Sequence, residues 1–67
     1  MQVIVVIGLL AGTVDEVEAF FSEDSALRYE AQLCESLGVP LGPQEREAYR
    51  DGGGENDVQV FHCTVEV

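Results

Sequence analysis

Lysine and tryptophan are absent from this 67-residue sequence, and basic side chains of any kind are scarce. The only cations are Arg28, Arg46 and Arg50, set against 13 acidic residues, so the formal net charge is −10 at pH 7. Nucleic acids and anionic bilayers are bound through clusters of Lys and Arg, so direct binding to either is excluded. A protein with this net negative charge would attract a basic protein as its partner.

Metal-site and disulfide patterns are also lacking. Cys34, Cys63 and the single histidine His62 form no C-x-x-C pair and no Cys/His cluster spaced for zinc. We therefore expect no cofactor and no structural metal. We interpret both cysteines as reduced, buried hydrophobic residues, with a Cys34–Cys63 disulfide as the alternative. No basic leader precedes the apolar start, which predicts a cytoplasmic protein without membrane association.

The one long apolar run begins near the first residue. Val3–Ile7 is continuously hydrophobic and β-branched, and Leu9 and Leu10 follow Gly8. Apolar side chains fall on both parities of this segment, which is typical of a strand that is covered on both faces. We predict that it is the central strand of a sheet.

Residues 13–21 are compatible with two structures. Their Thr, Val and Phe content favours a strand, although the acidic residues occupy both parities. A capping box formed by Thr13 and Glu16 supports the alternative, in which residues 13–37 are helical in a βαβ unit. The strand is favoured because Ser22 begins a second, complete helix-start signal, and that helix is predicted to run to Leu37 with Gly38 as its cap.

The remainder predicts a long connection and a last strand. Residues 39–56 contain prolines and a glycine triplet, so we expect a mobile loop, or two helical turns over residues 43–50. Residues 57–67 alternate as a strand. The chain is therefore predicted to be one α+β domain over residues 1–67, ββαβ in order. Its three-stranded antiparallel sheet has the order 2-1-3, the first strand central, with one helix packed on one face.

One helix covers only one face of such a sheet, and the other face keeps apolar side chains exposed. Unless the 39–56 segment covers it through Leu41 or Tyr49, this face predicts a homodimer. The candidate interface residues take one parity of the first and last strands: Ile4, Val6, Val60 and His62.

Catalytic combinations are missing. His62 and Cys63 are neighbours in a strand and point to opposite faces, so they cannot form a nucleophile and base pair. Glu30 lies near the apolar arc of the helix and is a weak candidate for a perturbed, partly buried carboxylate. The densest acidic stretch is a candidate recognition surface: Asp15, Glu16, Glu18, Glu23 and Asp24.

These observations favour a small non-enzymatic interaction module that forms homodimers through its sheet. One alternative is an acidic decoy or inhibitor that occupies the basic groove of a nucleic-acid-binding protein. The other is a small-ligand-binding or enzymatic dimer with Glu30 or His62 in a pocket between subunits.

Overall fold

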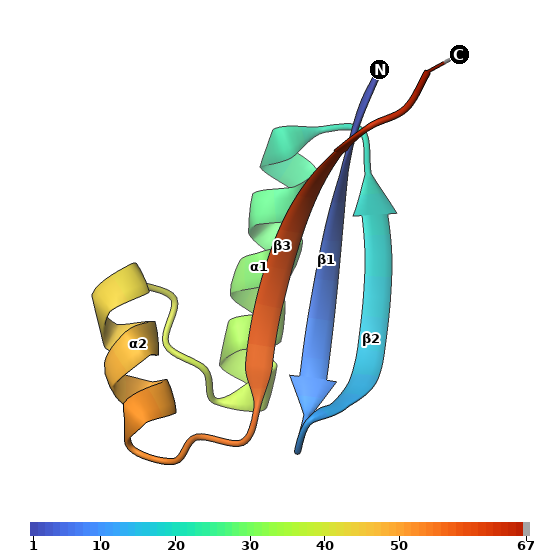
Figure 1. The fold of residues 1–67 in the computed structure, drawn as a ribbon. Coiled ribbons are helices and arrows are strands. Elements are labelled where there is room, and N and C mark those ends of the chain that lie inside the picture. The colour runs from blue at the N-terminus through green and yellow to red at the C-terminus, as the bar shows by residue number, and fades with distance from the viewer. Residues whose placement is uncertain (67) are drawn as a thin grey trace.

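The fold is a three-stranded antiparallel sheet with one helix packed on one face and a second helix beyond the edge of the sheet (Figure 1). The structure, a computed structural model, describes residues 1–66. The elements in chain order are β1 (Gln2–Leu10), β2 (Thr13–Phe20), α1 (Glu23–Leu37), α2 (Pro43–Asp51) and β3 (Asp57–Thr64). The strand order β2-β1-β3 confirms the predicted sheet with its first strand central. Residues 13–20 are a strand, so the helical alternative for 13–37 is wrong. Val67, part of the expected last strand, lies outside the described residues.

A two-residue turn joins β1 to β2. Both of its central residues have left-handed backbone angles, with φ of 51° at Ala11 and 81° at Gly12. Positive φ at both positions gives a turn whose twist matches that of the flanking strands, and Asn-Gly is the favoured pair there. Gly12 adopts this conformation freely, whereas Ala11 is strained. The Ala11 N–H donates to Oδ1 of Asn56 at 3.0 Å, which holds the turn against the start of β3.

A β-bulge in β2 places most of the polar and most of the apolar side chains of this strand on different faces of the sheet. Gly8 is paired with Glu16 and Leu9 with Val14, so Asp15 is an extra residue without a partner in β1. Without this insertion, Asp15 would lie opposite Leu9. The bulge therefore explains the imperfect alternation of this segment, because its parity reverses at Asp15.

The helix α1 begins and ends where its sequence signals place it. Ser22 Oγ accepts from the Ser25 N–H at 3.4 Å, and Gly38 caps the other end with φ of 71°. The helix lies close to β1, because methyl groups of Leu33 and Leu37 are 3.3 Å from the position that a Cβ would take at Gly8. The core beneath it consists of Ile4, Val6, Ala26, Leu33, Cys34, Val39 and Val58.

The 39–56 segment contains a helix, as the second of its two predicted forms allowed. The helix α2 has proline in its first turn and lies beside α1, beyond the edge of β3 (Figure 1). Tyr49 packs against the core, whereas Leu41 is exposed. No helix within residues 1–66 is long and apolar enough to cross a membrane.

The turn yields a first prediction. Replacing Ala11 with Asn should raise the free energy of unfolding by about 1 kcal/mol, because Asn tolerates the left-handed conformation that strains alanine. Urea unfolding followed by circular dichroism measures the change. Gly12→Ala is the matched comparison and should destabilise the protein, since it adds a second strained residue. A lower stability of the Asn variant would contradict the assigned turn.

Candidate functional site

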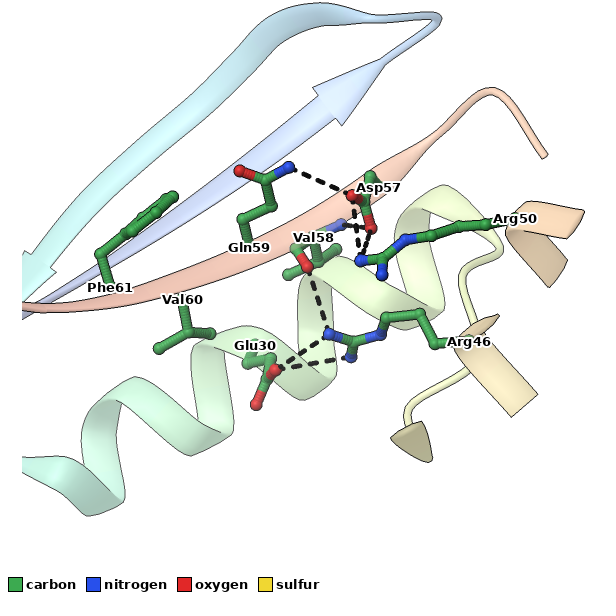
Figure 2. A pocket seen from close by; sticks show the side chains of 8 residues that line it. All are labelled: Glu30, Arg46, Arg50, Asp57, Val58, Gln59, Val60 and Phe61. Carbon is green, nitrogen blue, oxygen red and sulfur yellow. Dashed lines mark hydrogen bonds and ion pairs between the residues drawn. The ribbon is translucent and has the colours of Figure 1, made fainter. Parts of the chain in front are cut away.

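Arg46 is the centre of the largest polar cluster in the structure. Its guanidinium lies 3.4 Å from Oε2 of Glu30, and both side chains are mostly buried, at 13% and 16% exposed. It also donates to the carbonyls of Pro40, Leu41 and Val58, at 3.1, 3.4 and 3.2 Å. Its Nη2 lies 3.2 Å from Sγ of Cys34. One side chain from α2 thus joins α1, the connection after it and β3. Figure 2 shows its contacts with Glu30 and with the Val58 carbonyl.

A second ion pair lies beside the first. Arg50 donates to both carboxylate oxygens of Asp57, at 2.8 and 3.1 Å. Burial opposes ionisation of Asp57, but hydrogen bonds from Arg50, Gln59 and the Val58 N–H outweigh it and lower the pKa of this carboxyl.

The two ion pairs border an open cleft of about 590 Å³ between α2 and residues 58–61 of β3 (Figure 2). The formal charges of Glu30, Arg46, Arg50 and Asp57 cancel in this cleft. Both guanidinium groups already have carboxylate partners, so the cleft presents no free cation for an anionic ligand. Within the described residues, no group of three or more His, Cys, Asp or Glu side chains could hold a metal ion. The cleft therefore has neither a metal cluster nor an unpaired anion-binding group.

The sequence identified Glu30 but missed its partner. Glu30 lies on α1 as proposed, at the margin of the packed face. Its role here is to neutralise Arg46, which follows it by 16 residues on α2. The sequence did contain one signal for this ion pair. It has three arginines and 13 acidic residues, so a partly buried carboxylate such as Glu30 can find a cationic partner only in one of those three arginines.

The sheet face opposite α1 is uncovered and mainly apolar. The register places alternate residues of β1 on it, namely Val3, Val5, Ile7 and Leu9, with Val14, Val17 and Ala19 from β2 and Gln59, Phe61 and Cys63 from β3. We call these ten residues the free face. Phe61 is 47% exposed there, and Asp57, paired with Arg50, lies at its end.

The predicted interface residues have the opposite parity and do not form this face. Ile4 and Val6 are buried beneath α1, at 5% and 0% exposed, and Val60 packs against the same core. His62 is exposed but lies on the α1 side, where it borders a small cavity. The prediction that the side chains of Ile4 and Val6 lie on the uncovered face is wrong. Gly8 lies on the same face of β1 as these two residues, and α1 packs against that face because Gly8 has no side chain.

The predicted acidic surface divides into two parts. The charges of Asp15, Glu16 and Glu18 act on Tyr29 of α1, whose hydroxyl donates to Oε2 of Glu16 at 2.7 Å. This hydrogen bond, followed by burial and the nearby charges, raises the pKa of Tyr29 to about 12. Glu23 and Asp24 lie in the first turn of α1, where their negative charges interact favourably with the positive end of the helix dipole.

Both cysteines are free, so the disulfide alternative is wrong. Cys34 is buried in the core as expected, but Cys63 is exposed on the free face. Burial raises the pKa of the Cys34 thiol, although the Arg46 guanidinium beside it acts in the opposite direction.

Comparisons of the chain with protein-family models, curated proteins and solved structures found no match.

A second prediction concerns Arg46. Arg46→Ala should lower the free energy of unfolding by about 3 kcal/mol, because it leaves the Glu30 carboxylate partly buried without a partner. Urea unfolding compares it with Arg28→Ala, which removes an exposed arginine and should cost less than about 0.5 kcal/mol. The double variant Arg46→Met, Glu30→Met should recover much of the loss, since no charge is then left alone. Equal stability of the two alanine variants would contradict the role given to Arg46.

A third prediction concerns Tyr29. In a Tyr49→Phe background, the phenolate absorbance of Tyr29 should titrate with a pKa of about 12. Adding Glu16→Gln should lower this pKa towards 10, because the charged acceptor is lost. The neutral phenol is favoured in the folded state, so its contribution to stability is complete below pH 10 and disappears as the pH rises towards 12. A titration that Glu16→Gln leaves unchanged would contradict the hydrogen bond.

Proposed function

We propose that this protein is a non-enzymatic interaction module that pairs with a second copy of itself through the free face. The observation that carries the proposal is the composition of that face. In a chain with a net charge of −10, its ten side chains are uncharged, and the one carboxylate that the register adds at its end, Asp57, is paired with Arg50. An uncovered apolar sheet face on a small domain is typical of an association surface.

The distribution of charge favours a second copy as the occupant. Glu16 and Glu18 are paired with Gly8 and Val6, so the register directs them to the α1 side. Two copies can therefore place their free faces together without bringing the carboxylates of Glu16 and Glu18 into contact. The Arg50–Asp57 pair at the end of the face is neutral as a unit.

The size of the face sets the expected affinity. Three strands about 4.8 Å apart and eight residues long present a surface about 14 Å wide and 26 Å long. This is smaller than the roughly 800 Å² per partner of a standard stable interface. We therefore expect dimerisation at micromolar concentration. Repulsion between two acidic subunits should weaken it further at low ionic strength.

The fourth prediction tests this association. Val5→Asp places a charge at the centre of the free face and should shift sedimentation equilibrium from dimer to monomer while circular dichroism stays native. Leu41→Asp is the matched control, because it adds the same charge to an exposed apolar residue away from the sheet. If Val5→Asp fails to fold, Val17→Asp makes the same test at a more exposed position of the face.

Salt separates self-association from recognition of a basic partner. Raising the ionic strength should increase the dimer fraction, since it screens the repulsion between like-charged subunits. Binding of an acidic decoy to a basic groove would weaken under the same change. A wild-type chain that remains monomeric at 200 µM (about the upper end of a micromolar association) and high salt would overturn the proposal.

A further inference from the structure

The outer edge of β3 carries backbone groups that the sheet does not use. Met1 and Val65 exchange backbone hydrogen bonds, at 2.8 Å and 3.2 Å. The β1–β3 register continues from this pair without interruption. Hydrogen-bonded pairs alternate with non-bonded pairs along an antiparallel ladder. The N–H and C=O groups of Val58, Val60, His62 and Thr64 therefore point away from β1.

The first of these positions is closed by side chains. The Val58 carbonyl accepts from Arg46 at 3.2 Å, and the Val58 N–H donates to Oδ1 of Asp57 at 2.9 Å. Among the described hydrogen bonds, none occupies the corresponding groups of Val60 or His62. The edge is thus protected next to α2 and open from Val60 onward.

The two sides of this open edge differ in chemistry. On the α1 side lies a small cavity of about 30 Å³, with apolar walls that include Ala26 and Leu27 and with Glu23 and Glu30 at its margin. On the opposite side lies Phe61, half-exposed at the border of the free face. Successive side chains of a strand added here would point alternately to the α1 side, near the acidic Glu23, and to the opposite side, near the apolar Phe61.

We propose that the open edge of β3 binds an extended peptide segment of a partner protein as a fourth strand, with basic and apolar residues in alternation. Basic side chains lie on the α1 side, where their aliphatic stems cover the small cavity and their charges approach Glu23. Apolar side chains lie beside Phe61. Main-chain hydrogen bonds to Val60 and His62 supply the register.

Charge favours such a segment over a second copy of this chain at the edge. Two copies paired along β3 would bring the Glu23 of each subunit towards the same seam, and each subunit carries a charge of −10. A basic segment is attracted by the same field. The outward backbone groups of this edge do not belong to the free face, and Phe61 is shared by the two surfaces. Peptide binding at the edge does not require self-association.

The fifth prediction uses a fluorescent, capped peptide of alternating valine and arginine, seven residues long, in anisotropy titrations with the full chain. His62→Pro removes an outward N–H without removing a ladder bond and should weaken binding at least tenfold. His62→Val changes the same side chain but keeps the N–H, so the difference in affinity between the Pro and Val variants measures the contribution of the backbone donor. Ala19→Pro, the matched change at the outer edge of β2, should also leave binding unchanged.

Two further measurements separate strand addition from charge attraction alone. An added strand uses the N–H groups of every second residue, so one of the two alternately N-methylated peptides should lose binding while the other keeps it. Glu23→Gln should weaken binding several-fold, whereas Glu47→Gln on α2 should not. Equal binding by both N-methylated peptides, or by His62→Pro and the wild type, would overturn the proposal and leave only non-specific attraction.

Discussion

The partly buried Arg46 side chain is the interaction on which the arrangement of the second half of the chain depends. The helix α2 contributes no residue to the fully buried core, and its attachment is mainly polar. Arg46 satisfies three backbone carbonyls and the Glu30 carboxylate at once. An arginine is suited to this position because its planar group offers several donors in a fixed geometry. The cleft beside β3 and the protected end of its edge both follow from that attachment.

The bulge at Asp15 is the second constraint, because it determines which surface remains apolar. Strand β2 has to carry carboxylates in an acidic protein, yet one of its faces continues the free face of β1. By inserting one residue, the bulge brings Val14 opposite Leu9 in the place that Asp15 would otherwise take. The carboxylates of Glu16 and Glu18 remain on the side of Tyr29. A single irregularity thus keeps the part of the free face that β2 contributes uncharged within a chain of high negative charge.

The sequence predicted the elements better than their orientation. The β-branched run and the Ser22 and Gly38 caps are local signals, and each leads to the element found. The signals in residues 39–56 left a mobile loop and two helical turns open, and the structure has a helix there. The choice of free face was wrong because β1 is apolar on both parities. Gly8 could have indicated which face α1 covers, because a glycine within a strand often marks the close approach of another element. The Glu30–Arg46 pair could not be derived, because it depends on where residues 39–42 direct α2.

The two proposed surfaces are distinguished by how each meets the negative charge of the chain. A second copy would be repelled by that charge, so the surface proposed for it is the free face, where the one carboxylate, Asp57, is paired with Arg50. A basic partner would be attracted by the same charge, and the surface proposed for it is the edge of β3, which Glu23 borders. The free face, in contrast, has no unpaired carboxylate for a basic partner. The protected Val58 position sets one end of that edge, so an added strand has a defined starting point beside α2. The same charge imbalance therefore distinguishes the proposed self-association surface from the proposed peptide-binding edge on a single small sheet.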